Sequence, residues 1–219
     1  MMKVFCLFTA IFLVFSCETK KPVKEVSIKD DVYFLADDSQ EGRKTGSETE
    51  KQSANYLAER FKNMGLAPKG TDGYLQPFTF KPKTNPHGEA TYNINKGDST
   101  ITGLNVVAYI DNKAENTVII GAHYDHLGFG NEGSLYRGEG AEIHNGADDN
   151  ASGVAVMMNL AKRLKGKNTN NNYLFISFSG EEMGLLGSNY FVKNPTIDTK
   201  KVNYMINMDM VGRLKDDKS

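Results

Sequence analysis

The sequence lacks an excess of charge of either sign. It contains 27 acidic and 26 basic residues among 219, which gives a formal net charge of −1 at pH 7. Proteins that attract nucleic acid or an anionic membrane surface through their electric field carry a basic excess. The charge balance therefore argues against nucleic acid as a partner. With 39% hydrophobic and 24% charged residues, the composition is that of an ordinary globular domain.

Cysteine is almost absent, since Cys6 and Cys17 are the only two. If the chain is cleaved before Cys17, the mature protein keeps that one cysteine, and its sulfur carries a lipid. A domain without a free thiol cannot use a cysteine nucleophile, a cysteine-bound zinc or an internal disulfide. Any metal must then be held by histidine and carboxylate side chains.

The sequence also lacks an apolar run long enough to cross a membrane at its amino terminus. The run over residues 4–15 is about a dozen residues long, whereas a spanning helix needs about 20. A lysine precedes the run and charged residues follow it, as is typical of a signal peptide. Ser16-Cys17 resembles a bacterial lipoprotein cleavage site, and a plainly secreted protein is the alternative. We therefore expect a signal peptide over 1–16 and a tether over 17–27.

These features predict where the protein is found. We expect an exported bacterial lipoprotein, in the periplasm or at the cell surface, whose only contact with the membrane is a lipid anchor on Cys17. The sequence gives no prediction of the membrane leaflet or of the oligomeric state.

The rest of the chain, residues 28–219, contains no internal repeat and reads as one domain. Apolar residues recur at helical spacing over 47–64 and 150–164, with Ser47 and Asn150 as candidate amino-terminal caps. Short runs rich in β-branched residues predict strands over 103–110, 117–122, 173–179 and 202–208. We expect an α/β fold in which a mostly parallel mixed sheet is sandwiched between helices.

Side chains that can bind metal follow three of the predicted strands, and a fourth group opens the second helix. These groups are His123-Tyr124-Asp125-His126, Glu181-Glu182, Asp209 and Asp148-Asp149-Asn150. Taken alone, each has an ordinary interpretation as a solvated turn, a helix cap or a buried histidine. Reactive groups of α/β sheets gather at the carboxyl ends of strands, so the four together predict one shared site.

The same groups lie in four blocks that resemble the signature blocks of metallopeptidase family twenty-eight, the co-catalytic di-zinc aminopeptidases. The blocks are residues 121–128 (Gly-Ala-His-Tyr-Asp-His-Leu-Gly), 146–153, 178–188 and 207–212. Glutamate carboxypeptidases and glutaminyl cyclases are relatives of these enzymes. The resemblance extends over roughly residues 28–214 and implies a sheet of the zinc-exopeptidase type, peptide substrates and zinc as the cofactor.

The resemblance also implies roles for individual residues. His123, Asp149 and Asp209 would bind one metal, and Asp149 would bridge to a second metal held by Glu182. Glu181 would be the general base. The implied reaction removes amino-terminal residues from peptides, with a bridging water activated by the two metals and by Glu181.

The resemblance gives a supporting role to one further polar residue of these blocks and no role to two others. The resemblance implies that Asp125 orients the imidazole of His123 through its second nitrogen, and it gives no ligand role to His126 or Asp148. In extended backbone, neighbouring side chains point to opposite sides, so one of two adjacent glutamates can bind metal while the other stays free as a base.

The sequence lacks a histidine after Asp209, where the family has a fifth metal ligand. The only histidines are His87, His123, His126 and His144. We therefore expect one complete metal position and one incomplete position, in a chain truncated at its carboxyl end whose sheet is incomplete there. His144, in the loop before Asp148, is a minor alternative for the missing ligand.

Two other motifs are rejected, and two other functions stay open. Residues 128–133 match the dinucleotide-binding glycine pattern, but they neither follow a strand directly nor open a helix. No Gly-x-Ser-x-Gly elbow supports serine catalysis. The open alternatives are a single-zinc acyltransferase of the glutaminyl cyclase type and a catalytically silent interaction lipoprotein.

Overall fold

The structure is a computed structural model that describes residues 27–83, 88–130 and 133–213. The predicted signal peptide, the cleavage site at Cys17 and almost all of the tether lie outside the described residues, as does His87. These assignments therefore stay predictions. Within the described ranges, no helix combines the length and the apolar character needed to cross a membrane.

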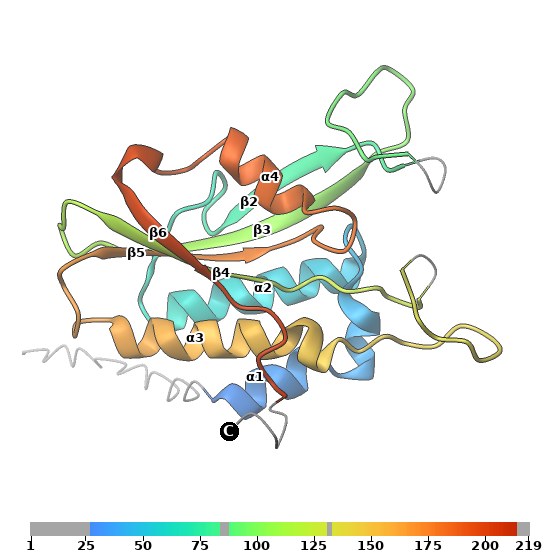
Figure 1. The fold of residues 1–219 in the computed structure, drawn as a ribbon, viewed down its shortest axis with the longest axis horizontal. Helices are drawn as coiled ribbons and strands as arrows, with labels where there is room; N and C mark the ends of the chain where they lie inside the picture. Colours follow the sequence, from blue (N-terminus) through green and yellow to red (C-terminus); the bar gives the residue numbers. More distant parts are fainter. Residues whose placement is uncertain (1–26, 84–87, 131–132, 214–219) are drawn as a thin grey trace, which may run out of the picture.

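A six-stranded mixed sheet forms the middle layer (Figure 1). Its strands are β1 (Ala67–Pro68), β2 (Leu75–Phe80), β3 (Ile101–Ile110), β4 (Thr117–His123), β5 (Asn172–Phe178) and β6 (Val202–Asn207). The order is β1-β3-β5-β4-β6, and β2 pairs with β3. β4 is parallel to β5 and β6, whereas β3 is antiparallel to β1, β2 and β5.

The predicted mixed α/β sheet is thus confirmed, with one difference. Parallel pairing does not prevail among the described strands but is confined to β5, β4 and β6. β2 and β3 follow one another without a crossover helix, and strands joined in this way pair antiparallel.

Helices cover both faces of the sheet, as predicted (Figure 1). α1 (Ile28–Leu35), α2 (Glu48–Asn63) and α3 (Gly153–Leu164) lie on one face, and α4 (Leu186–Lys193) lies on the other. Alternate residues of β5 serve the two cores. Phe175 packs in the cluster that contains Phe61 of α2, and Ile176 packs in the cluster that contains Phe191 of α4. This alternation is what a strand covered on both faces requires.

The first residues of two helices can be compared with the caps predicted from the sequence. Ser47 caps α2, because its Oγ accepts a hydrogen bond from the N–H of Glu50 at 3.0 Å. The helix expected from Asn150 begins at Gly153, after an irregular turn over Ala147–Ser152 in which Asp149 has non-helical backbone angles. Asn150 still caps this helix, since its Oδ1 accepts from the N–H of Gly153 at 3.0 Å.

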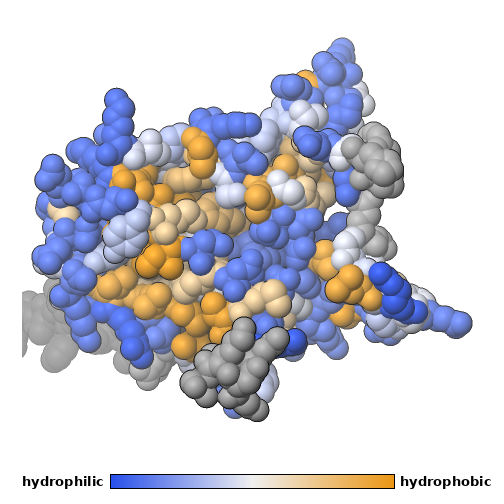
Figure 2. Space-filling model, in the orientation of Figure 1, coloured by the Kyte–Doolittle hydropathy of each residue, from blue (hydrophilic) through white to orange (hydrophobic). Residues whose placement is uncertain are grey.

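The register of the parallel strands determines where the site lies. His123 pairs with Phe178 across β4 and β5, and Gly121 pairs with Asn207 across β4 and β6. The segments that leave these three strands therefore start side by side at one sheet edge. β6 pairs with no described strand besides β4, and Tyr204, Met205 and Ile206 are exposed along it, where Figure 2 shows apolar side chains gathered.

Candidate metal centre

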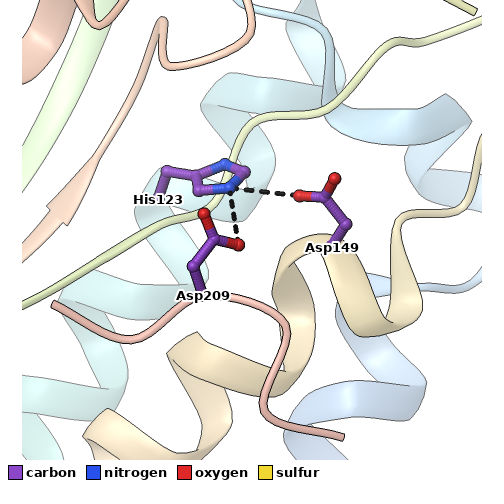
Figure 3. A group of neighbouring side chains, drawn as sticks. All are labelled: His123, Asp149 and Asp209. Carbon is purple, nitrogen blue, oxygen red and sulfur yellow. Dashed lines mark ion pairs between the residues drawn. The ribbon is translucent and has the colours of Figure 1, made fainter. Parts of the chain in front are cut away.

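Three of the predicted ligands meet at the sheet edge. The Nε2 atom of His123 lies 3.1 Å from Oδ1 of Asp149 and 3.5 Å from Oδ1 of Asp209 (Figure 3). His123 ends β4, Asp209 follows β6, and Asp149 comes from the turn before α3. One imidazole nitrogen and two carboxylate oxygens form the donor set that zinc accepts in hydrolytic sites. These residues therefore fit the metal that the sequence implies.

The electrostatics of this group favour a cation. Burial lowers the pKa of the His123 imidazole, but the nearby carboxylates of Asp125 and Asp149 outweigh burial and raise the pKa to about 11. The same imidazole lowers the pKa of Asp149. The carboxylates thus create a negative potential around Nε2, which a bound divalent cation would neutralise.

A second group contains a residue to which the sequence gave no role. Asp149, Glu182 and His126 can each place a ligand atom within 4.8 Å of the others, and Asp149 belongs to both groups. Glu182 was expected here with Asp149, whereas His126 was not. A signal for it was present in the sequence, since His126 follows the same strand end as His123, but spacing alone does not show which way the ring points.

Asp125 lies beside Nδ1 of His123, and its carboxylate also contacts the segment of the two glutamates. Nδ1 of His123 lies 3.2 Å from the backbone oxygen of Asp125 and 3.7 Å from its carboxylate, so the carboxylate is beyond hydrogen-bond distance of the ring. The fully buried carboxylate also accepts hydrogen bonds from the N–H groups of Glu181 (3.2 Å) and Glu182 (3.3 Å) and from Oγ1 of Thr45 (3.0 Å). Asp125 therefore orients the segment that carries the two glutamates.

That segment is a turn, not the extended backbone that we expected. β5 ends at Phe178, Gly180 has a φ of 69°, and the N–H of Gly184 donates to the backbone oxygen of Glu181 at 2.9 Å. Positive φ at this point favours glycine, which has no Cβ. The two glutamates nonetheless diverge, since Glu181 lines a cavity with His123 and Glu182 lines another with His126.

Glu181 lies beside the first group without belonging to either metal-binding group among the described residues. Burial raises the pKa of its carboxyl; the His123 imidazole opposes this, and the carboxylates of Asp125, Glu182 and Asp209 add to it. A carboxylate with a raised pKa is a better proton acceptor near neutral pH than an ordinary glutamate.

Arg43 joins the segments that carry the ligands. Its buried guanidinium donates to the backbone oxygens of Tyr124 (2.7 Å), Asn145 (2.7 Å) and Gly146 (3.0 Å), and also to that of Leu35. Tyr124 follows His123 directly, and Gly146 lies three residues before Asp149. The sequence gave no sign of the contacts with Tyr124 and Gly146, because a single arginine 81 and 103 residues away from its partners leaves no local pattern.

We expect Arg43→Met to destabilise the protein by about 3 kcal/mol or more, because buried carbonyl oxygens lose their donors at about 1–3 kcal/mol each. Urea unfolding followed by circular dichroism measures this change. The exposed Arg137, whose guanidinium donates to the backbone oxygens of Ser134 and Tyr136, supplies the control, and Arg137→Met should change stability by less than about 0.5 kcal/mol. Equal midpoints for the two variants would show that Arg43 does not join these segments energetically.

The remaining candidates take no part in either group. The N–H of Gly128 donates to the backbone oxygen of Gly42 at 3.1 Å, and no helix follows among residues 133–146, so the glycine pattern is part of a loop. The Nε2 atom of His144 lies 2.6 Å from Oγ of Ser134, and His144 belongs neither to the His123 group nor to the His126 group. Asp148 accepts a hydrogen bond from the N–H of Gly212 at 2.8 Å and so fastens the segment after Asp209.

The sequence is similar to those of several known proteins. The alkaline phosphatase isozyme conversion protein of Escherichia coli (strain K12) is 30% identical over 177 residues, which cover 81% of this chain and 48% of that protein. A probable leucine aminopeptidase of Trichophyton verrucosum (strain HKI 0517) is 37% identical over 118 residues, or 51% of this chain and 29% of the relative. The chain thus spans half or less of the length of these relatives.

Solved structures share the fold at lower identity. A Zn-dependent exopeptidase from Parabacteroides distasonis ATCC 8503 has a TM-score of 0.65 at 20% identity, covering 87% of this chain and 63% of that one. The glutaminyl cyclase of Porphyromonas gingivalis has a TM-score of 0.62 at 23% identity, covering 85% and 62%. The sequence profile of Peptidase family M28 matches residues 105–219, which include every residue of both metal-binding groups. Because this match extends over more than half of the chain, the chain belongs to Peptidase family M28.

Proposed function

We propose that this protein is a metal-dependent exopeptidase that removes amino-terminal residues from peptides. The observation that carries the proposal is the meeting of His123, Asp149 and Asp209 beside Glu181, which is free of both metal-binding groups. A hydrolase of this kind needs a metal position and a separate base within reach of the same water. The probable leucine aminopeptidase among the relatives supports release of amino-terminal residues.

His123, Asp149 and Asp209 would hold the metal. A zinc ion bound there supplies a Lewis acid, which polarises the carbonyl of the scissile bond and makes a water molecule more acidic. The residues around the ligands hold them in place. Asp125 fixes the turn of Glu181 through its N–H, and Asp148 fixes the segment that follows Asp209.

Glu181 would move the proton. Its carboxylate takes a proton from the attacking water as the new bond from oxygen to the carbonyl carbon forms. The protonated carboxyl then gives that proton to the amine nitrogen as the bond between carbon and nitrogen breaks. The raised pKa of Glu181 suits both steps, because the group has to accept a proton and release it again.

Two substrates separate the proposal from its nearest alternative. The glutaminyl cyclase of similar fold favours a second candidate, in which the amino-terminal glutamine of a peptide cyclises and loses ammonia. We expect the zinc-loaded chain to release free leucine from a leucyl peptide and to leave a glutaminyl peptide uncyclised. Mass spectrometry of the products distinguishes the two reactions.

Chelation provides the control for this assay. Because His123, Asp149 and Asp209 would act through the metal, a chelator should remove leucine release and added zinc should restore it. Cyclisation without leucine release would favour the acyltransferase. The absence of both products from zinc-loaded protein would contradict the proposed peptidase and favour a catalytically silent interaction protein.

A further inference from the structure

Glu50 carries a buried carboxylate at the start of α2, and the residue is only 1% exposed. Its Oε2 atom accepts a hydrogen bond from the N–H of Gly46 at 2.8 Å, a contact typical of an acidic residue in the first turn of a helix. The other oxygen, Oε1, takes no part in this cap and accepts from the N–H of Leu104 in β3 at 3.1 Å. The role of helix cap therefore accounts for only one of the two oxygens.

The same Oε1 atom joins the segment of a metal ligand to the segment of the base. It accepts a hydrogen bond from Oγ of Ser179 at 2.6 Å. It also accepts from the hydroxyl of Tyr124 at 2.9 Å, a group that lies 2.6 Å from the backbone oxygen of Leu104 as well. Tyr124 directly follows His123, and Ser179 lies two residues before Glu181. One oxygen atom of α2 therefore connects the end of β4 with the turn after β5.

The turn after β5 also directs its backbone N–H groups at buried side chains. The N–H of Ser179 donates to Oδ1 of Asn105 at 3.1 Å, and the N–H of Gly180 donates to Oγ1 of Thr45 at 3.1 Å. Ser179, Asn105 and Thr45 are all buried. The position of the turn, and of Glu181 within it, therefore depends on a buried polar network.

A carboxylate is a costly side chain in this place, because burial removes a charged group from water. An apolar side chain of similar length would fill the same volume at a lower cost of desolvation. A carboxylate instead fixes geometry, since each donor must approach one oxygen within a narrow range of distances. The four donors around Glu50 therefore indicate a role in setting the positions of its neighbours.

We propose that Glu50 is a positioning residue, whose carboxylate sets the place of Glu181 relative to His123 through Ser179 and Tyr124. This inference rests on the proposed function for the role of Glu181 as the base. Glu50 belongs to neither metal-binding group and lies outside residues 105–219, which the family profile matches.

Hydrogen exchange tests the contact without relying on activity. In Glu50→Met, a side chain of similar length offers no acceptor to Ser179 or Tyr124. Mass spectrometry of the zinc-loaded full chain then follows the amide exchange of a peptide over residues 178–184. We expect this exchange to be faster by about tenfold or more, since a hydrogen bond to a charged group is lost, while peptides of α3 exchange as in the original chain.

Kinetics on the leucyl peptide show whether the position matters for the reaction. In Glu50→Met the base and the ligand are displaced but not removed, so kcat should fall by about 10- to 100-fold while KM stays within about twofold. The metal content at saturating zinc should be unchanged, because Glu50 is not among the ligand groups.

Two further variants keep the test decisive. Glu50→Gln should restore most of kcat, because the carboxamide oxygen can accept from Tyr124 and Ser179 and only the contact with Gly46 is left unmade. Ser179→Ala removes the hydroxyl that joins Glu50 to the turn and should reproduce the faster exchange and the lower kcat. It replaces Glu50→Met if circular dichroism shows that variant to be unfolded.

Asp31→Leu is the matched control. Asp31 is another buried carboxylate, and its partners Tyr56 and Arg60 lie in the later half of α2. Its replacement should destabilise the fold and leave kcat and the exchange of residues 178–184 as in the original chain.

Each outcome supports or overturns the positioning role. Unchanged exchange over residues 178–184, or faster exchange with unchanged kcat, would overturn it. Equal effects in Asp31→Leu would also overturn it, since they would come from lower stability alone. The proposed function fails separately, through the absence of leucine release from the zinc-loaded original chain. Hydrogen exchange needs no activity and then still shows whether Glu50 holds the turn.

Discussion

Replacing Glu181 by glutamine is expected to lower kcat/KM for peptide hydrolysis by about 10²–10⁴-fold and to leave the metal content unchanged. Glutamine has the size and shape of glutamate but cannot accept a proton at neutral pH. Because Glu181 belongs to neither metal-binding group, the loss should appear in turnover alone. The N–H of residue 181 still donates to Asp125 in the variant, so the position of the turn should be retained.

The measurement combines steady-state kinetics on a leucyl peptide with elemental analysis of the same protein samples. Glu139→Gln is the control, since Glu139 is an exposed glutamate outside both groups, and its kinetics should match those of the original chain. Near-normal turnover in Glu181→Gln would exclude this residue as the base. If Glu181→Gln also contains less metal than the original chain, Glu181 takes part in metal binding.

Replacing Asp149 by asparagine is expected to weaken metal binding at both positions. Asp149 belongs to the His123 group and to the His126 group, and asparagine offers one uncharged carboxamide oxygen in place of two charged ones. We expect the affinity for the first equivalent to fall by about 100-fold or more, with little bound metal at micromolar concentration.

Asp148 provides a close control for this experiment. It is the neighbour of Asp149 in the same turn, and its Oδ1 accepts from the N–H of Gly212 at 2.8 Å, a bond that the oxygen of asparagine can keep. Asp148→Asn should therefore bind metal as the original chain does. Unchanged stoichiometry and affinity in Asp149→Asn would exclude the shared carboxylate and, with it, the two-metal arrangement.

Much of the fold could be predicted because its signals are local. The runs that became β3, β4, β5 and β6 are short and apolar, and a signal of this kind lies within the strand itself. β4 and β5 are buried along their whole length, whereas β6 is exposed. The cap at Ser47 depends on a residue only three positions away. By contrast, β2 was not predicted, because its pairing partner β3 begins about 20 residues later along the chain.

The group formed by His123, Asp149 and Asp209 could also be predicted from signals along the sequence. His123 ends β4, Asp209 comes two residues after β6, and Asp149 lies in the turn before α3, so the rule that strand ends gather at one edge brings them together. The backbone at Glu181 could not be predicted in the same way. Its turn depends on Gly180 and on the hydrogen bond that the N–H of Glu181 donates to Asp125, a residue 56 positions away.

The sequence by itself determined the order of the elements, the family resemblance and the residue types at the strand ends, because these depend on neighbours along the chain. Only the tertiary structure decided that His126 faces Glu182 and that Arg43 joins the segments of His123 and Asp149. These contacts join residues 56 to 103 positions apart. Their distances follow from how helices and strands pack around one core, which no local pattern encodes.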